Sequence, residues 1–279
     1  MGLDLLDRPG VQDTFDRAAA ILGWSVQDRI SGDETELSQT IYTQPCLYTV
    51  ECILVDLLNA AGETPDFVAG HSLGEYVALY AAGAIDFETG LRLVKRRGEL
   101  MQNAAGGQMM AMMKFDRDQL EAAISATDGV VLANDNSPLQ AVISGTPEAV
   151  EAIAASVKSR RAIKLNVSGA FHSPLMEPAS QDFATVLASV QFKDATIPVM
   201  SNVDPTPETA AAALHDRLSR QMTGSVRWRE ISLSLPDLGV DRVVEVGPGQ
   251  VLTGLIGRTV SDLELVNIQG AGDLTAVAV

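Results

Sequence analysis

The sequence predicts an α/β protein in which a mainly parallel sheet is interrupted by a smaller inserted unit. Helical and strand-like segments alternate over most of the chain, which favours a parallel sheet. Between residues 107 and 168 the order of the segments changes, which indicates an insertion. Hydrophobic residues make up 46% of the 279 positions, enough to bury a large core.

The segment before the insertion is predicted to hold several helices and one short strand. Apolar positions with a helical period indicate the helices, and a glycine follows three of them, as is common where a chain leaves a helix. A short apolar run indicates the strand. In order, we expect helices over residues 11–22 and 45–61, a strand over 67–69, and helices over 75–82 and 86–101.

The insertion begins after Gly106-Gly107, which breaks the preceding helix. Its predicted order is βαββαβ, the split βαβ pattern of a ferredoxin-like unit. We therefore expect a large subdomain built from residues 1–106 and 169–279 and a ferredoxin-like small subdomain over 107–168. The expected elements are strands over 109–115, 130–133, 140–144 and 162–167, and helices over 118–126 and 147–158.

Helices and strands alternate again after the insertion. We expect helices over 174–190, 207–222, 226–235 and 251–256, and strands over 197–201 and 242–246.

Two loop motifs are open to two interpretations. The motif from Asn134 to Pro138 either lines a cleft or, for most of its length, forms a turn, and we favour the turn. The motif from Gly247 to Gln250 either cradles an anion or simply joins a strand to a helix.

Composition excludes several classes of protein. A formal net charge of −16 argues against a general nucleic-acid binder, because such proteins need clustered cations. No apolar run reaches the ~18 residues of a membrane span and no signal peptide is visible, so we expect a cytoplasmic protein. Cys46 and Cys52 lie in one helical segment and support neither a disulfide framework nor a metal site.

A serine between two glycines is the clearest chemical signal. Ser72 stands in Gly70-His71-Ser72-Leu73-Gly74, directly after the predicted strand and before a helix, as a nucleophile elbow requires. Small neighbours are expected on both sides because the backbone of such a turn is crowded. The N–H of Leu73, at the start of the helix, is placed to stabilise a developing oxyanion.

A serine nucleophile needs a base, and the chain has three histidines. His71 is adjacent to Ser72, and neighbouring side chains of an extended backbone point in opposite directions. His215 is expected on the solvent face of a helix. His172 follows a predicted strand and precedes a helix, in the kind of loop where catalytic groups lie, and is the best candidate.

Arg97 is the second unusual residue. On a helical wheel it is the charged residue at the centre of an apolar stripe that includes Leu93, Val94 and Met101. A buried guanidinium needs an anion or several acceptors. That anion is either an internal carboxylate, the commoner case, or part of a substrate held by the guanidinium fork.

These residues resemble the malonyl-CoA:acyl carrier protein transacylase family. The matching pieces are GHSLGEY from Gly70, Arg97, AFHSPLM from Ala170, Arg220-Gln221 with Val226-Arg227-Trp228, and VEVGPGQVLTGL from Val244. They occur in order along nearly the whole chain, and together they are far more specific than the serine motif alone.

The resemblance implies an α/β-hydrolase-like large subdomain and a set of roles. Ser72 would take the malonyl group from malonyl-CoA, with His172 as base and then acid, and pass it to the phosphopantetheine thiol of an acyl carrier protein. The main-chain carbonyl of Gln221 would orient His172, Arg97 would bind the malonyl carboxylate, and Phe171 and Asn134 would contact the substrate. No cofactor is expected beyond the coenzyme A thioester.

Because the chain is strongly negative, any acidic partner needs a local basic patch, which is a possible docking site for the carrier protein. Arg160 and Arg161, with Lys158 and Lys164, form the best basic cluster outside the predicted helices, although a solvated charged turn fits the same residues.

One part of the family pattern is not found. Family members begin with a hydrophobic strand and a Gly-Gln-Gly-Ser-Gln loop that supplies a second oxyanion donor, and the resemblance leads us to expect a truncated start with weak or no activity. Two other interpretations stay open. A serine esterase or thioesterase is expected to have an acidic third member and a histidine near the C-terminus. A non-catalytic remnant would only bind a carrier protein.

Overall fold

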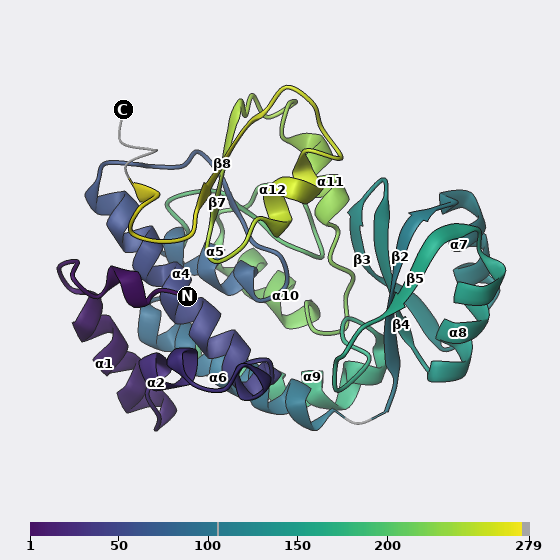
Figure 1. Cartoon of the computed structure of the whole chain (residues 1–279), viewed down its shortest axis with the longest axis horizontal. Helices are drawn as coiled ribbons and strands as arrows, with labels where there is room; N and C mark the ends of the chain where they lie inside the picture. Colours follow the sequence, from purple (N-terminus) through teal and green to yellow (C-terminus); the bar gives the residue numbers. More distant parts are fainter. Residues whose placement is uncertain (105, 275–279) are drawn as a thin grey trace.

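The computed structural model describes residues 1–104 and 106–274 and has two parts (Figure 1). The large part is a bundle of helices around short parallel strands, and the small part projects from it as a sheet covered by two helices. Of the predicted large subdomain, 1–106 and 169–279, residue 105 and residues 275–279 lie outside the described residues.

The large part is built on two pairs of parallel strands. β1 (Val68–Ala69) pairs with β6 (Val199–Met200), and β7 (Arg242–Val246) pairs with β8 (Glu264–Ile268). Long helices α4 (Thr40–Ala60) and α6 (Phe87–Asn103) pack along one another beside them. The other elements are η1 (Leu3–Leu5), α1 (Val11–Leu22), α2 (Val26–Ser31), α3 (Glu34–Leu37), α5 (Gly74–Ala81), η2 (Pro174–Met176), α9 (Glu177–Leu187), α10 (Ala211–Arg220), α11 (Trp228–Ser234) and α12 (Val251–Ile256).

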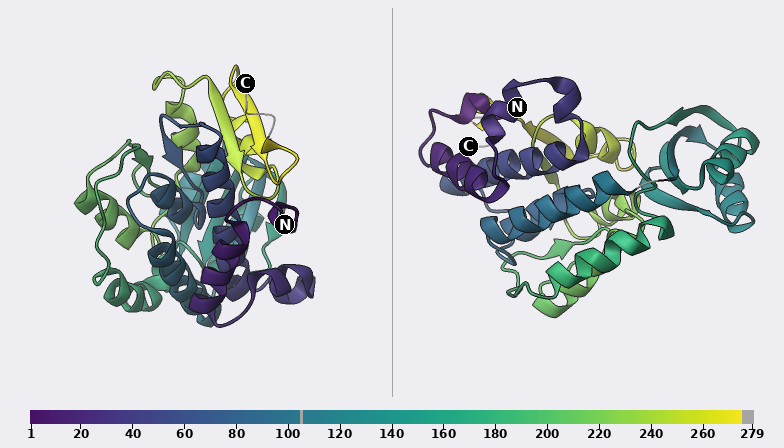
Figure 2. Two further views of the ribbon diagram at one scale, coloured as in Figure 1. Left: turned by 90° about the vertical axis from the view of Figure 1, so that its left-hand side faces the viewer. Right: turned by 90° about the horizontal axis from the view of Figure 1, so that it is seen from below.

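The small part is a four-stranded antiparallel sheet in the order β3-β4-β2-β5. α7 and α8 cover one face, where Met112 and Ile143 pack against Leu120 and Ile153. The other face turns toward the large part (Figure 2). Its elements are β2 (Gln108–Phe115), α7 (Arg117–Ser125), β3 (Val130–Ser137), β4 (Gln140–Gly145), α8 (Pro147–Ser156) and β5 (Ser159–Lys164). This order of strands is the ferredoxin-like one, so the predicted fold class is confirmed.

Several predicted boundaries are wrong. The segment Asn134–Ser137, which we expected to be mostly a turn, continues β3, because its backbone pairs with β4 through two register shifts and with Val226 on its other side. The last strand of the insertion covers 159–164 instead of 162–167, since an edge strand tolerates exposed charged residues. Helices α2 and α3 and strand β8 were not predicted from the sequence.

The helix expected over residues 45–61 begins earlier than the sequence predicted. α4 begins at Thr40, and Pro45 lies inside it, where the missing N–H costs one hydrogen bond of the helix.

Among the described residues, none of the helices combines the length and the apolar composition that a membrane span requires.

Candidate active site

The elbow between β1 and α5 has the strained backbone expected of a nucleophile turn. Ser72 has φ of 52°, in the left-handed region that non-glycine residues seldom occupy. A Cβ on Gly70 would lie 1.9 Å from the backbone of Gly74, so only glycine fits there. Gly74 itself is different, because a Cβ on it would meet no atom within 4 Å. The crowding expected on both sides of Ser72 is therefore confirmed at Gly70, whereas Gly74 has room for at least a Cβ.

Asn202 braces this elbow from the neighbouring strand. β6 runs parallel to β1, so the ends of the two strands meet at the same edge. The Asn202 side chain accepts a hydrogen bond from the Ser72 N–H (2.7 Å) and donates one to the Gly70 carbonyl (2.6 Å). A single buried amide thus satisfies backbone groups on both sides of His71. Asn202 was not predicted from the sequence, although a polar residue just after a strand was the available signal.

Ser72 and His172 are in direct contact. Ser72 Oγ lies 2.8 Å from His172 Nε2, and His172 Nδ1 lies 3.0 Å from the Gln221 carbonyl and 3.2 Å from the Gly224 carbonyl. Because carbonyl oxygens only accept, Nδ1 carries the proton and Nε2 is free to accept from the serine hydroxyl. The geometry joins three of the residues singled out from the sequence and adds Gly224.

His172 is held in its neutral form. It is buried, and this burial, aided by the charge of Arg97, lowers its pKa to about 3, although the two carbonyl hydrogen bonds act in the opposite direction. A neutral imidazole with a free Nε2 is the form that can take a proton from Ser72.

Arg97 lies beside Ser72 and is only 1% exposed. Its Nη1 donates to Gln44 Oε1 (2.6 Å), and its Nη2 donates to Ser72 Oγ (2.9 Å) and Gln221 Oε1 (3.3 Å). Among the described residues no Asp or Glu forms an ion pair with it, and its Nε has no partner. The described residues therefore place no carboxylate in direct contact with the guanidinium, and its hydrogen bonds go to neutral oxygen acceptors.

Glu75 carries a carboxylate whose charge raises the pKa of Arg97, after the larger effects of burial, which lowers it, and of Tyr76. Its carboxylate accepts hydrogen bonds from Gln221 Nε2 (2.8 Å) and the Asn202 N–H (3.2 Å), so an amide side chain stands between it and Arg97. Burial raises the pKa of Glu75, and these hydrogen bonds oppose the rise. From the sequence, Glu75 was predicted only to form part of a helix.

Ser72 and His172 lie in a cleft of about 340 Å³ between the two parts. Its lining includes both polar and apolar side chains. The polar residues besides Ser72 and His172 are His71, Asn134, Asn136 and Gln140, and the apolar ones are Met101, Met109, Ala111, Val142, Leu165, Val167 and Phe171. The predicted substrate contacts Asn134 and Phe171 are thus both in the cleft. Arg97, although it touches Ser72, is buried behind it.

The remaining histidines have other partners. His71 Nε2 lies 2.8 Å from Asn136 Oδ1, and the ring packs edge-on against Trp228. Burial lowers the pKa of His71. His215, which we expected on a solvent face, is half-buried, and its Nε2 lies 3.2 Å from the Leu187 carbonyl.

Leu73 stands at the start of α5, and in the described part of the chain its N–H has no hydrogen-bond acceptor. This N–H is therefore available to a developing oxyanion.

The N-terminus of α12 differs, because Glu245 accepts from the N–H groups of Leu252 and Thr253. The motif from Gly247 to Gln250 therefore leads into a helix whose first N–H groups already bind an internal carboxylate. Of the two interpretations, this favours a simple connection between a strand and a helix.

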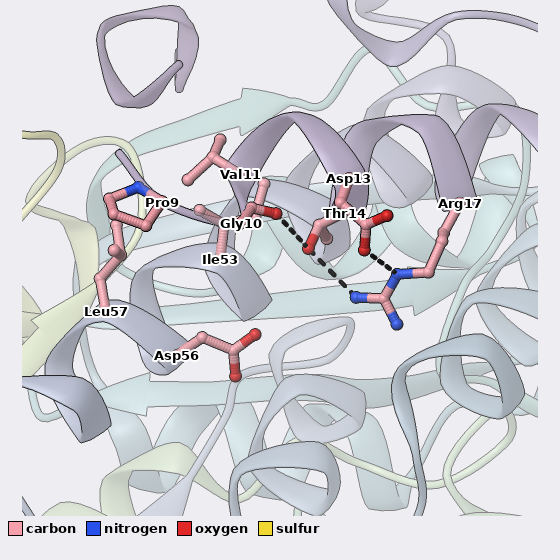
Figure 3. Close-up of a pocket in the computed structure, with 9 residues that line it drawn as sticks. All are labelled: Pro9, Gly10, Val11, Asp13, Thr14, Arg17, Ile53, Asp56 and Leu57. Carbon is pink, nitrogen blue, oxygen red and sulfur yellow. Dashed lines mark hydrogen bonds and ion pairs between the residues drawn. The ribbon is translucent and has the colours of Figure 1, made fainter. Parts of the chain in front are cut away.

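A second cavity, of about 220 Å³, lies between α1 and α4 and is lined by Asp13, Thr14, Arg17 and Asp56 among others (Figure 3). Arg17 is paired there with Asp13 and Glu88. None of the candidate site residues lines this cavity.

The chain is similar to known proteins along nearly its whole length. The model of the acyl transferase domain matches residues 1–275. The chain belongs to the acyl transferase domain family. A malonyl CoA-acyl carrier protein transacylase of Synechocystis is 56% identical over 277 residues, which cover 99% of this chain and 94% of the relative. Its namesake in Escherichia coli K12 is 41% identical over 268 residues, covering 91% of this chain and 86% of the relative.

Solved structures of this family agree in shape as well. The crystal structure of the Synechocystis transacylase covers 99% of this chain and 94% of its own, with a TM-score of 0.97 and 56% identity. A structure of a type II PKS acyl-carrier protein in complex with its malonyl-transacylase covers 98% of this chain and 92% of its own, with a TM-score of 0.93 and 36% identity. The acyl transferase domain thus accounts for both parts of the fold.

Proposed function

We propose that this protein transfers a malonyl group from malonyl-CoA, through an ester on Ser72, to the phosphopantetheine thiol of an acyl carrier protein. The observation that carries the proposal is the position of Arg97. A buried guanidinium without a carboxylate partner lies against the serine hydroxyl, where the free carboxylate of a malonyl ester would be within reach. The names of the relatives support the same substrates.

The first half of the reaction loads the serine. Ser72 Oγ attacks the thioester carbonyl while His172 Nε2 takes the hydroxyl proton, as their contact of 2.8 Å allows. The Leu73 N–H, which lies at the start of α5, supports the negative oxygen of the tetrahedral intermediate. Collapse breaks the carbon–sulfur bond, and His172 returns its proton to the departing coenzyme A thiolate.

The second half repeats these steps with a new thiol. The phosphopantetheine thiol gives its proton to His172 Nε2 and attacks the ester carbonyl, and Ser72 leaves with the proton from His172. During both halves the Gln221 carbonyl holds the Nδ1 proton, so the ring keeps one orientation.

Arg97 would bind the malonyl carboxylate by exchanging partners. Its two Nη atoms donate to the side chains of Gln44, Gln221 and Ser72, all neutral oxygen acceptors. A carboxylate is a stronger acceptor for the planar fork, so the substrate supplies the charge that the site lacks. The same clamp holds the acyl chain for attack by the thiol.

The basic cluster on β5 is the proposed docking site for the carrier protein. Arg160 and Arg161 are exposed, and the ion pairs of the described residues include neither of them. The chain that follows β5 carries Leu165 and Val167, which line the cleft. In a protein of net charge −16, an acidic partner would be attracted to this cluster, which the chain joins directly to two cleft-lining residues.

The test is intact-mass measurement after incubation with malonyl-CoA alone and then with a carrier protein. We expect a malonyl adduct on the wild-type chain that disappears when holo carrier protein is added, and no adduct on Ser72→Ala. Release of free malonate as fast as transfer to the thiol would instead indicate a hydrolase, and a folded chain that forms no adduct would indicate a non-catalytic carrier-binding protein.

A further inference from the structure

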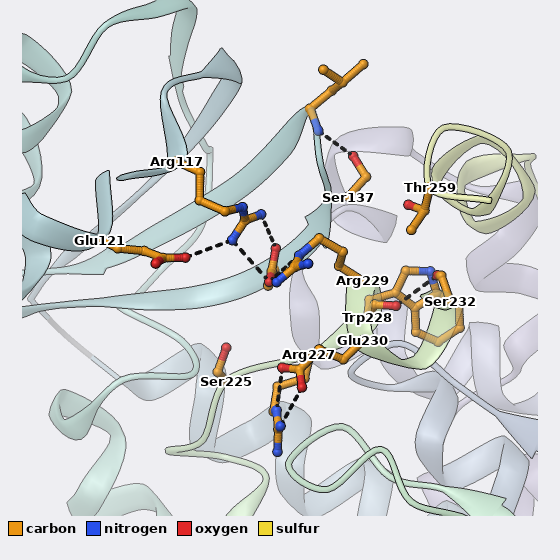
Figure 4. A network of polar contacts seen from close by, with 12 residues as sticks. Arg117, Glu121, Ser137, Ser225, Arg227, Trp228, Arg229, Glu230, Ser232 and Thr259 are labelled. Carbon is orange, nitrogen blue, oxygen red and sulfur yellow. Dashed lines mark hydrogen bonds and ion pairs between the residues drawn. The ribbon is translucent and has the colours of Figure 1, made fainter. Parts of the chain in front are cut away.

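A buried carboxylate joins the two parts of the molecule, between the cleft-lining residues Asn134 and Asn136 in the sequence. Asp135, on β3, is 4% exposed and accepts hydrogen bonds from Arg117 Nη2 (2.8 Å) and Arg229 Nε (2.8 Å). Arg117 begins α7 in the small part, whereas Arg229 belongs to α11 in the large part (Figure 4). Of these two bonds, the one from Arg229 crosses between the parts.

The backbone makes the same connection. The Asp135 N–H donates to the Val226 carbonyl (2.9 Å), and the Val226 N–H donates to the Ala133 carbonyl (2.8 Å). This segment of the large part therefore lies against the edge of β3 as a short parallel addition to the small sheet. Arg229 follows three residues later, so the ion pair and the backbone pairing hold one short stretch of chain.

That stretch also reaches His172. The Gly224 carbonyl, two residues before Val226, is one of the two acceptors for His172 Nδ1. The other is the Gln221 carbonyl, and the Gln221 side chain is bound to the Ser72 carbonyl (2.8 Å). One acceptor of the imidazole is thus tied to the nucleophile elbow, and the other is tied through Val226 to the small part.

We propose that Asp135 and Arg229 are positioning residues for His172. Their ion pair holds the segment from Gly224 to Val226 against β3, which keeps the Gly224 carbonyl where it accepts the Nδ1 proton. The inference rests on the proposed role of His172 as the base. Without the pair, the imidazole is oriented by the Gln221 carbonyl alone, and its Nε2 meets the Ser72 hydroxyl in the reactive geometry less often.

Arg117 offers a matched control. Arg117→Gln and Arg229→Gln each remove one arginine from the same carboxylate, and the two side chains are equally exposed, at 25%. Arg117 lies within the small part, so its loss leaves the connection between the parts intact. A role of Asp135 that was merely structural would make the two variants behave alike.

The experiment measures single-turnover malonyl loading of Ser72 over a range of malonyl-CoA concentrations, together with the NMR signal of the His172 Nδ1 proton. For Arg229→Gln we expect the limiting rate to fall by about tenfold to a hundredfold, because small displacements of a catalytic group cost this much. The half-saturating malonyl-CoA concentration should change by less than about threefold, since the transition state is affected more than ground-state binding. The Nδ1 proton should shift upfield as its second hydrogen bond weakens.

For Arg117→Gln we expect the wild-type limiting rate and the wild-type Nδ1 signal. Arg229→Lys keeps the charge but loses the Nε donor, so it should give an intermediate rate, and it replaces Arg229→Gln if that variant does not fold. A folded Arg229 variant with wild-type rate and signal, or an equal loss in Arg117→Gln, would overturn the proposal. If the wild-type chain forms no adduct, the proposed function fails, and the Nδ1 signals still decide whether Arg229 positions the ring.

Discussion

Nη2 of Arg97 donates a hydrogen bond of 2.9 Å to Oγ of Ser72, so a fully buried guanidinium and the elbow hydroxyl belong to one site. In a hydrolase of uncharged esters this arrangement has no purpose and carries the cost of burying a charge. In a transferase of a dicarboxylic acyl group it places a cation where the second carboxylate must lie.

Arg97→Ala is therefore expected to change the choice of acyl group. Malonyl loading should fall by about a hundredfold, which corresponds to ~2.7 kcal/mol in the transition state, because a charge-assisted contact is lost. Acetyl-CoA, which lacks the carboxylate, should load at least as well as it does on the wild type. Intact-mass time courses with both thioesters measure this preference. An unchanged malonyl-to-acetyl ratio in a folded variant would contradict the assignment.

The two glycines of the elbow provide a second prediction with its own control. Gly70→Ala places a Cβ 1.9 Å from the Gly74 backbone and should prevent folding or abolish loading. Gly74→Ala places a Cβ in open space at the start of α5 and should keep or raise the melting temperature, with a gain of about 0.4 to 1 kcal/mol. Thermal unfolding compares the two, and equal destabilisation would refute the steric argument.

The sequence predicted the fold class and the pairing of Ser72 with His172 because both depend on local patterns. Glycine spacing marks the elbow, and a lone arginine on an apolar stripe marks Arg97. Gln44 and Gly224 could not be predicted, because each contributes through a contact across the fold and has no local signature. Asn202 also acts across the fold, and its one local sign is a polar residue just after a strand. The segment Asn134–Ser137 shows the same limit. Its residues favour turns, yet contacts with Val226, His71 and the two arginines hold it as a strand.

Asn202→Ala should weaken both the elbow and the fold. The variant leaves the Ser72 N–H and the Gly70 carbonyl without partners, and an unsatisfied buried group costs about 1 to 3 kcal/mol. Urea unfolding should show this loss, and loading of Ser72 should slow because the elbow is no longer held. Asn166→Ala, at an exposed asparagine, is the control and should match the wild type. Normal stability and loading in Asn202→Ala would show that the backbone alone holds the turn.

Burial of His172 predicts how stability depends on pH. Its pKa is about 3 in the folded chain and near 6.5 in the unfolded one, so between these values the unfolded state binds the extra proton. The contribution to stability is fully present above pH ~6.5 and is lost progressively as the pH falls toward 3. Urea unfolding at a series of pH values should therefore show a shallower decline for His172→Gln than for the wild type. Parallel curves would mean that His172 is not buried as a neutral ring.

The same pKa predicts the pH dependence of the reaction. Because the imidazole stays neutral above pH ~4, the loading rate of the free enzyme should show no histidine titration between pH 5 and 8. Many enzymes with an exposed histidine base lose activity in this range. An inflection near pH 6.5 that vanished in a His71→Asn variant would assign it to His71, whereas one that persisted would show that His172 is protonated far more easily than its burial implies.

Variants of the proposed docking residues Arg160 and Arg161 are expected to separate the two halves of the reaction. Arg160→Glu combined with Arg161→Glu should leave loading from malonyl-CoA within about twofold of the wild type, because neither residue lines the cleft. Transfer to the carrier protein should slow at low carrier concentration, and the effect should shrink as salt is added, since long-range attraction between exposed charges is screened. Arg92→Glu, a charge reversal at an exposed position on α6, is the control and should affect neither step. If Arg92→Glu slows transfer as much as the double variant does, net charge rather than this cluster governs the encounter.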